Sequence, residues 1–246
     1  MSQWDRSSMR DQRAYQTNLE ALVRTRTEQL RSAILDLERS YDITLEVLAD
    51  ALGLRDAEAK LRSQRTCVFA KAIASAMGVP KDEMGVIMRG AFLHDIGMLG
   101  VPESILNKPT ALEPYEYARM KEHCYLGYKL VQKIPFLHEA AEIVYAHHER
   151  FNGTGYPRGL RGDEIPLGAR ICAVADSFDA IMSHRQYRAA RTFEAARKDI
   201  RAGSGKQFDP RVVTAFLGIP EHVWRDLRRE IEARSNPTQA DRKRSR

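Results

Sequence analysis

Apolar residues recur at the three- and four-residue spacing of an α-helix through most of this sequence, from residue 57 to residue 234. The period-two alternation of a half-buried strand is absent from the same stretch. Gly78 with Pro80, and later Gly97, stop two of these apolar patterns, as these residues do at helix ends. The spacing therefore predicts an all-α domain. Its expected helical segments are 57–77, 81–95, 102–107 (a short turn or helix), 113–132, 137–148, 168–182, 192–202, 210–216 and a polar last helix at 221–234.

The N-terminal part carries a seven-residue repeat. One seam consists of Thr27, Ile34, Tyr41 and Leu48, and a second seam consists of Val23, Leu30, Leu37 and Thr44. Two such seams with charged residues between them are typical of a coiled coil, so we expect residues 19–50 to form a long helix that makes a parallel homodimer. The alternative is one amphipathic helix that packs on its own domain. Residues 1–18 are polar and are expected to be flexible.

Composition restricts the class of protein. The 246 residues, 43% of them hydrophobic, suffice for one domain with a complete core and an appendage. The net charge of +6 is mildly basic, and half of it lies in the tail 241–246, where four basic residues accompany Asp241; we interpret this tail as solvated, with nucleic-acid binding as the minor alternative. Cys67, Cys124 and Cys172 are interpreted as core residues of a reducing compartment. Neither a membrane-spanning run nor a signal peptide is recognised, so a cytoplasmic location is expected.

Imidazole and carboxylate groups gather in the middle of the sequence. His94 and Asp95 stand side by side at the end of an apolar run, and His123, His147-His148 and Asp176 follow. These groups are the ligands that zinc, iron and manganese take. A satisfied core pair is the ordinary alternative for His94-Asp95 alone. Four histidines and two aspartates exceed what one metal needs, so the count indicates two metals that share a bridging carboxylate.

One long loop follows the second pair of histidines. It runs from Arg150 to Gly162 and contains four glycines and Pro157. A long, glycine-dense loop directly after two histidines is more often functional than accidental.

The ordered motifs resemble the HD-GYP family, a branch of the HD phosphohydrolases that hydrolyses the bacterial messenger cyclic di-GMP. The motifs are His94-Asp95 with Gly97, His147-His148-Glu149, Gly155-Tyr156-Pro157 with Gly159-Leu160, and Ile165-Pro166. The resemblance covers about residues 54–218. It implies an HD-superfamily helical domain at 51–218, followed by a C-terminal helix and a disordered basic tail at 219–246. The seven-residue repeats resemble the helices that join family members to sensor or receiver domains.

The family pattern also implies roles for individual residues. The implied metal ligands are His94, Asp95, His123, His147, His148 and Asp176, with His94 and Asp95 at the catalytic centre and Asp95 as the bridging carboxylate. Glu58 matches a glutamate that some members use for a third metal. Arg185 and Arg188 match positions that bind phosphate, and a solvated helix end is their alternative. The implied cofactors are two divalent ions, iron or manganese before zinc. Glu149 and Asp179 are candidate partners of the imidazoles, or else ordinary surface acids or caps.

The Gly155-Tyr156-Pro157 loop is expected to be structural, with a second role in docking diguanylate cyclase (GGDEF) domains.

At two positions the sequence departs from the family. Arg62 stands where the family has a metal-binding histidine, and Met98 stands where it has a phosphate-binding lysine. A protonated arginine has no lone pair for a metal. We therefore expect the Arg62 guanidinium to point toward Asp95 and Asp176, with only one metal bound, or alternatively to point to solvent.

Two functions of different classes follow from the resemblance. The first is a metal-dependent phosphodiesterase that converts cyclic di-GMP to linear pGpG and further to GMP. The second is a degenerate domain that binds the nucleotide or a protein partner with little or no turnover. The intact His147-His148-Glu149 motif favours the first, whereas Arg62 and Met98 favour the second. Hydrolysis of another cyclic dinucleotide is an alternative that the sequence leaves open.

Overall fold

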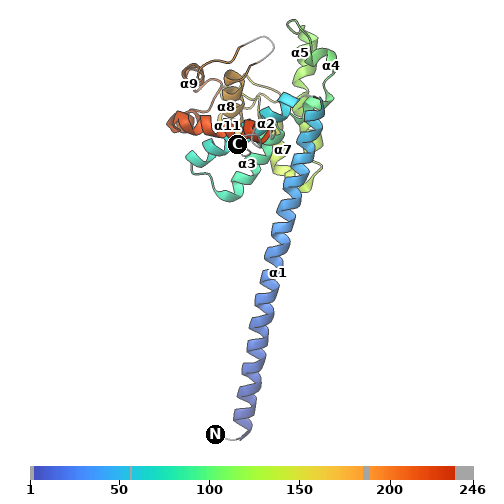
Figure 1. Ribbon diagram of the computed structural model, residues 1–246, viewed down its shortest axis with the longest axis vertical. Coiled ribbons are helices and arrows are strands. Elements are labelled where there is room, and N and C mark those ends of the chain that lie inside the picture. The colour runs from blue at the N-terminus through green and yellow to red at the C-terminus, as the bar shows by residue number, and fades with distance from the viewer. Residues whose placement is uncertain (1–2, 56, 185–188, 236–246) are drawn as a thin grey trace, which may run out of the picture. The chain divides into compact units, whose positions relative to one another are not determined.

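The computed structural model describes residues 3–55, 57–184 and 189–235 (Figure 1). Its helices are α1 (Gln3–Arg55), α2 (Ala57–Ala76), α3 (Lys81–Leu93), η1 (Ile96–Gly100), α4 (Glu103–Leu106), α5 (Pro114–Lys121), α6 (His123–Val131), η2 (Pro135–Leu137), α7 (His138–Ala146), η3 (Gly162–Glu164), α8 (Leu167–Met182), α9 (Phe193–Ala202), α10 (Pro210–Gly218) and α11 (Glu221–Ser235). The described residues form no strand, only two isolated bridges. The all-α prediction is confirmed.

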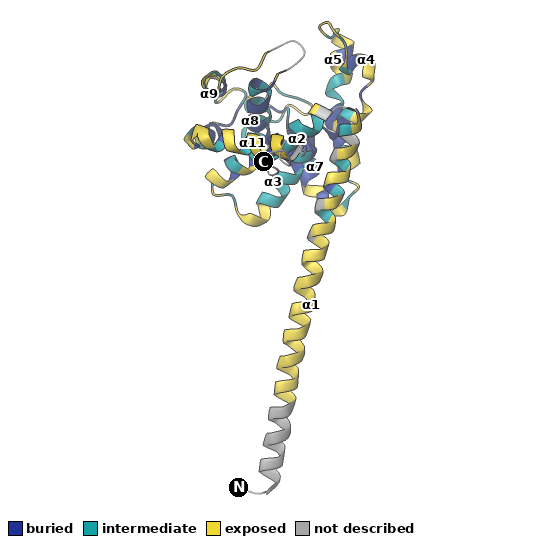
Figure 2. Cartoon of the chain, in the orientation of Figure 1, coloured by how far each residue is buried: buried dark blue, intermediate teal, exposed yellow. Residues whose placement is uncertain are grey.

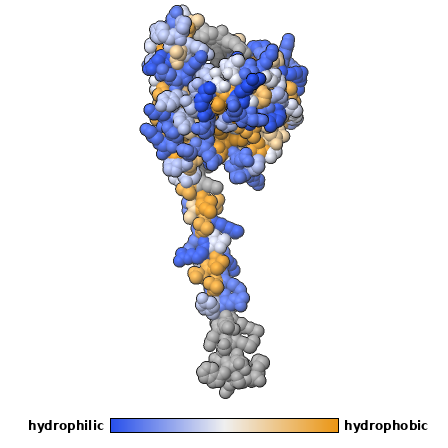
Figure 3. Space-filling model, turned by 180° about the vertical axis from the view of Figure 1, so that it is seen from behind, coloured by the Kyte–Doolittle hydropathy of each residue, from blue (hydrophilic) through white to orange (hydrophobic). Residues whose placement is uncertain are grey.

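The chain divides into two compact units, residues 1–46 and residues 47–246. In the first unit, α1 leaves several apolar side chains exposed, with exposed fractions of 57% for Val23, 62% for Leu30 and 47% for Ile34 (Figure 2). Figure 3 shows apolar groups along this helix as orange areas between blue hydrophilic ones. Among the described residues, no helix is long and apolar enough to cross a membrane.

Two helix boundaries differ from the expectation. The segment 1–18, expected to be flexible, is helical from Gln3 onward, because no glycine or proline interrupts the chain before Gly53. The single helix expected over 113–132 divides into α5 and α6 at Glu122, whose backbone (φ −63°, ψ −17°) makes a tighter turn than an α-helix. This division places His123 at the start of α6.

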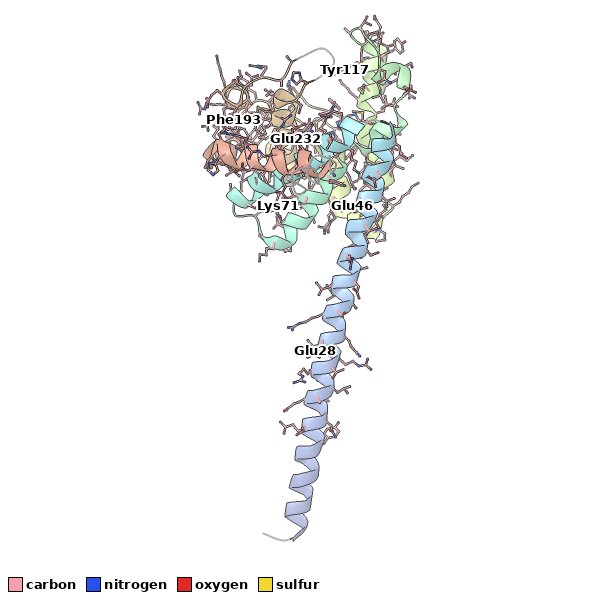
Figure 4. All side chains as sticks on the ribbon, viewed as in Figure 1. Glu28, Glu46, Lys71, Tyr117, Phe193 and Glu232 are labelled. Carbon is pink, nitrogen blue, oxygen red and sulfur yellow. The ribbon has the colours of Figure 1, made fainter. Side chains whose placement is uncertain are left out.

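The core of the second unit surrounds α8. Phe178 of α8 packs against Phe69 of α2, Phe216 of α10 and Trp224 of α11, with ring centroids 5.0 to 5.2 Å apart. Phe193, which begins α9 and is labelled in Figure 4, lies at 6.0 Å from Phe178. Trp224 is 2% exposed, so α11 belongs to this core. The expected domain boundary at residue 218 therefore lies between two helices that share this core, because a mostly polar helix still buries one aromatic side chain.

A close approach at Gly97 brings the His94-Asp95 segment against α6. A Cβ atom on Gly97 would lie 1.9 Å from the carbonyl oxygen of His123 and 2.5 Å from the backbone nitrogen of Gly127. Real Cβ atoms do not tolerate such distances, so only glycine lets η1 reach α6 this closely. Gly97 thus positions Asp95 beside His123.

Candidate functional site

Three histidines stand at helix ends and share one hydrogen-bonding arrangement. The Nδ1 atoms of His94, His123 and His147 lie 2.7 to 2.8 Å from the carbonyl oxygens of Ala91, Met120 and Val144, three residues earlier in each case. The last carbonyls of an α-helix lack partners within the helix, which makes them available here. A carbonyl oxygen only accepts, so each Nδ1 carries a hydrogen and each neutral ring keeps its lone pair on Nε2.

These Nε2 atoms converge on the Asp95 carboxylate. His94 Nε2 lies 3.3 Å from Asp95 Oδ2, whereas His123 Nε2 and His147 Nε2 lie 3.6 and 3.9 Å from Asp95 Oδ1. Asp176 of α8 joins the group, with its Oδ1 atom 3.8 Å from His94 Nε2. The His148 ring lies 4.1 Å from the His147 ring and 5.1 Å from the His123 ring, measured between centroids. The structure therefore brings together the four histidines and two aspartates singled out in the sequence.

The hydrogen-bonding state of this cluster indicates a place for a cation. His123 Nε2 and His147 Nε2 lie 3.2 Å apart. Both Nδ1 atoms donate hydrogen bonds to backbone carbonyls, so if both rings are neutral, the lone pairs of the two Nε2 atoms point at each other and no hydrogen bond joins them. Burial and the neighbouring His148 hold the pKa of His147 well below its usual range, so protonation of His147 does not relieve the opposition. His94 Nε2 is also buried, and it faces the carboxylates of Asp95 and Asp176 at 3.3 and 3.8 Å. The residues present thus fit a divalent metal.

Burial and charge act against each other within the cluster. Burial disfavours ionised Asp95, but His94, His123 and Arg62 outweigh it and hold the pKa of Asp95 well below its usual range. Burial likewise disfavours charged His94, yet the carboxylates of Asp95 and Asp176 raise the pKa of His94 to about 9. At His148, burial and the charge of His123 prevail and lower the pKa to about 4. His148 is therefore neutral at pH 7, which is the form that binds a metal.

Arg62 of α2 faces the Asp95 carboxylate, as expected. Its Nη1 atom lies 3.5 Å from Asp95 Oδ2, and its side chain is 24% exposed. The two oxygens of Asp95 therefore face different groups: Oδ2 faces Arg62 and His94, and Oδ1 faces His123 and His147. Met98 lies half-buried in η1 and supplies no positive charge.

A buried arginine holds three further polar side chains. Arg65 grips Asp179 through two hydrogen bonds of 2.5 and 3.0 Å, and donates to Glu58 at 2.6 Å and to Ser183 at 3.3 Å. Burial opposes the charge of Arg65, but Asp179 and Glu58 outweigh it and raise its pKa. The guanidinium thus engages Asp179, one of the two acids considered as imidazole partners. The role of Glu58 at a third metal stays a prediction.

Glu149 organises the loop that contains Gly155-Tyr156-Pro157. Its buried carboxylate accepts hydrogen bonds from the backbone N–H groups of Arg158, Gly159 and Leu160, at 2.7 to 3.1 Å. Glu149 is therefore neither a surface acid nor a helix cap, because its buried carboxylate satisfies the amides of a loop. At Gly155, a Cβ atom would lie 2.2 Å from the backbone nitrogen of Arg150, so only glycine fits there. The loop folds directly onto the His147-His148 segment.

A cavity of about 420 Å³ opens beside the cluster. Its walls include His147, His148 and Asp176 together with Tyr117, Lys121 and Tyr156. Tyr117 comes from α5 and is labelled in Figure 4, and Lys121 Nζ lies 4.5 Å from its ring centroid and 5.0 Å from that of Tyr156. The Tyr156 ring lies 4.9 Å from the His148 ring. The cavity therefore joins the imidazole cluster to two aromatic rings and a cation.

Some predicted site residues fall outside this picture, and others were missed. Arg185 and Arg188 lie outside the described residues, as does the tail from residue 236. Sequence reasoning did not single out Lys121 or Arg65. It interpreted Cys124 as a core residue, and the residue is indeed buried, but its Sγ atom lies 3.5 Å from His123 Nε2. The adjacency of Cys124 to His123 was the available signal.

Comparison with known proteins finds relatives of this chain. The HD-domain family matches residues 46–212. Over 188 residues the chain is 41% identical to a cyclic di-GMP phosphodiesterase of Thermotoga maritima, covering 76% of this chain and 51% of that protein. It is 40% identical over 192 residues to the cyclic di-GMP phosphodiesterase response regulator RpfG of Xanthomonas campestris, covering 77% and 51%. The chain thus spans about half the length of these curated relatives.

The chain also resembles a third relative and a solved structure. The 3'3'-cGAMP-specific phosphodiesterase 2 of Vibrio cholerae is 34% identical over 186 residues, covering 75% of this chain and 36% of that protein. The fold resembles Bd1817, an HDG"Y"P protein from Bdellovibrio bacteriovorus, with a TM-score of 0.55, 20% identity, and coverage of 72% and 62%. The chain belongs to the HD-domain family. Within that family, its resemblance to the HD-GYP branch is confirmed.

Proposed function

We propose that this chain is a metal-dependent phosphodiesterase that hydrolyses cyclic di-GMP to linear pGpG and further to GMP. The observation that carries the proposal is the opposition of His123 Nε2 and His147 Nε2 at 3.2 Å beside the ionised Asp95. Relatives that are named cyclic di-GMP phosphodiesterases add support for the reaction and the substrate.

The proposed ligands divide into two groups. His123, His147 and His148 would hold one divalent ion, and His94 and Asp176 would hold a second, with Asp95 between the two groups. Iron or manganese is the proposed metal, with zinc as the alternative. When bound, such ions supply an activated water and bind phosphate oxygens. The backbone carbonyls that fix the Nδ1 hydrogens orient the imidazoles, which limits reorganisation when metal binds.

The cavity beside the cluster suits a nucleotide. Tyr117 and Tyr156 present aromatic faces on which a base can stack, and Lys121 supplies a cation for a phosphate group. We also propose that Arg185 and Arg188 bind phosphate. Because a V. cholerae relative is named as cGAMP-specific, a mixed cyclic dinucleotide is the alternative substrate.

A second candidate function is a nucleotide-binding module with little turnover. The Arg62–Asp95 contact favours it, because a guanidinium neutralises Asp95 without activating water. Met98 favours it as well, since it lacks the positive charge of the lysine that the family has at this position.

The proposed assembly is a homodimer through residues 19–50. Contact of the Gly155-Tyr156-Pro157 loop with a GGDEF domain, and a cytoplasmic location, stay predictions.

The test combines metal analysis with a turnover assay on the purified chain. Phosphodiesterase function predicts bound metal and conversion of cyclic di-GMP to pGpG, with loss of both after chelation and recovery on adding iron or manganese. Calorimetric binding of cyclic di-GMP without product would instead establish the binding module. Changing both Arg185 and Arg188 to Ala should weaken nucleotide binding and leave metal content unchanged; unaltered affinity would reject their role.

A further inference from the structure

Cys124 lies within the imidazole cluster rather than merely near it. The residue follows His123 in α6 and is fully buried. Among the described residues, one ligand atom each from His123, Cys124, His147 and His148 can be chosen so that all four lie within 4.8 Å of one another. Four soft or borderline donors so close together, three of them imidazoles, make up the ligand mix of a zinc or iron centre.

The two distances recorded within this group match the edges of a metal tetrahedron. Ligand distances of about 2.05 Å to nitrogen and about 2.3 Å to sulfur place two nitrogens about 3.3 Å apart and a nitrogen and a sulfur about 3.5 Å apart. The observed distances are 3.2 Å between His123 Nε2 and His147 Nε2, and 3.5 Å between His123 Nε2 and Cys124 Sγ. Both edges are therefore already in place for an ion between them.

We propose that Cys124 is a metal ligand and that it binds, together with His123, His147 and His148, the ion that these three histidines would hold. This inference rests on the proposed metal-dependent function and deepens it. Binding replaces the S–H bond by a metal–sulfur bond, and the thiol proton leaves to solvent. The thiolate neutralises part of the charge of the ion and favours zinc or iron over manganese.

Asp95 leaves room for a further ligand at this ion. Asp95 Oδ2 is engaged by Arg62 at 3.5 Å and faces His94 at 3.3 Å. Only Asp95 Oδ1 faces the imidazoles of this ion, at 3.6 Å from His123 Nε2 and 3.9 Å from His147 Nε2, and Cys124 Sγ lies equally near, at 3.5 Å from His123 Nε2. The competing interpretation is that the thiol only donates a hydrogen bond to His123 Nε2.

Cobalt(II) substitution distinguishes the two interpretations. The chain, stripped of metal and loaded with cobalt, is expected to show sulfur-to-cobalt charge-transfer absorption in the near ultraviolet, which imidazole and carboxylate ligands do not give. Cys124→Ser should abolish this absorption. The same variant should bind cobalt more weakly. Loss of a residue that only hydrogen-bonds to a metal ligand weakens metal binding roughly 10- to 100-fold, so loss of a ligand itself should weaken it at least as much. Cys67→Ala, which removes a thiol of α2 that is absent from the ligand group, is the matched control and should change neither quantity.

Proton release gives a second readout. Titrating zinc into the metal-free chain should release one more proton from the wild type than from Cys124→Ser. Absence of the charge-transfer band from the cobalt-loaded wild type overturns the inference, whether or not any variant folds. Turnover of cyclic di-GMP is measured on the same samples. Turnover without the charge-transfer band would overturn the sulfur ligand and leave the proposed function standing. A charge-transfer band without turnover would overturn the proposed function and leave the sulfur ligand standing. A wild type that takes up no cobalt would overturn both.

Discussion

Arg62 Nη1 lies 3.5 Å from Asp95 Oδ2, on the side of the carboxylate that also faces His94. A guanidinium at this distance lowers the negative charge that Asp95 can offer to an ion, and it occupies space beside the His94–Asp176 group. The charge that a metal would supply on this side of Asp95 is therefore partly supplied by a side chain that cannot activate water.

Replacing Arg62 by histidine should raise metal content toward two ions per chain and increase turnover. The imidazole restores a lone pair and removes the competing cation. Adding Met98→Lys should increase turnover further, because a lysine supplies a point charge for phosphate. Metal analysis and hydrolysis of cyclic di-GMP measure both effects. Arg24→His on the exposed surface of α1 is the control. If the wild type already binds two ions and Arg62→His changes neither quantity, the hypothesis is wrong.

Removing one imidazole of the central pair should remove metal-dependent stabilisation. An ion that binds only the folded state at 100 times its dissociation constant adds about 2.7 kcal/mol, which corresponds to a rise in Tm of about 5–10 °C for a chain of this size. His147→Ala should lose this rise, as measured by thermal unfolding with and without added metal. His138→Ala, at the exposed first residue of α7, the helix that ends just before His147, should keep it. An equal rise in both variants would place the ion elsewhere.

The sequence predicted the helices and the membership of the site for identifiable reasons. Helical periodicity depends on local spacing, so α2, α3, α8 and α9 were found within one or two residues. His94 and Asp95 were predicted together with the other histidines because the ordered motifs resemble a known family. The convergence of their Nε2 atoms required the fold, since the helices that carry them are far apart in sequence.

Other features depended on packing that the sequence does not encode locally. Glu149 was considered a partner for imidazoles, but its carboxylate is used by three amides of a loop that comes back onto it. The break at Glu122 has no glycine or proline beside it, since residues 115–126 contain neither, so periodicity alone continued the helix. The segment 221–234 was expected to be a polar helix, and only the contacts of Trp224 with Phe178 and Phe216 show that this helix contributes to the core.

Adding one methyl group at Gly97 should damage both stability and the site. A Cβ atom there would lie 1.9 Å from the carbonyl oxygen of His123, so η1 must move away from α6. We expect Gly97→Ala to lower the free energy of unfolding by about 3 kcal/mol and to reduce metal affinity, because Asp95 shifts relative to His123. Denaturant unfolding and metal titration measure these effects. Gly218→Ala is the matched control, since no described atom lies within 4 Å of its Cβ position. Equal stability of the two variants would contradict the packing argument.

The seven-residue seam of α1 should hold two chains together. Ile34 lies on the seam and is 47% exposed in the single chain, whereas Leu35 lies off the seam and is 65% exposed. A glutamate at a seam position would place two like charges in the apolar interface of a coiled coil, so Ile34→Glu should give a monomer in light scattering. Leu35→Glu introduces the same charge at a position outside the seam, and it should leave the dimer intact.

Removal of residues 1–49 should also give a monomer that still binds metal, because the proposed ligands all lie in the second unit. A truncated chain that remains dimeric would show that another surface forms the main interface. Dissociation by Leu35→Glu but not by Ile34→Glu would show that the helix pairs in a different register.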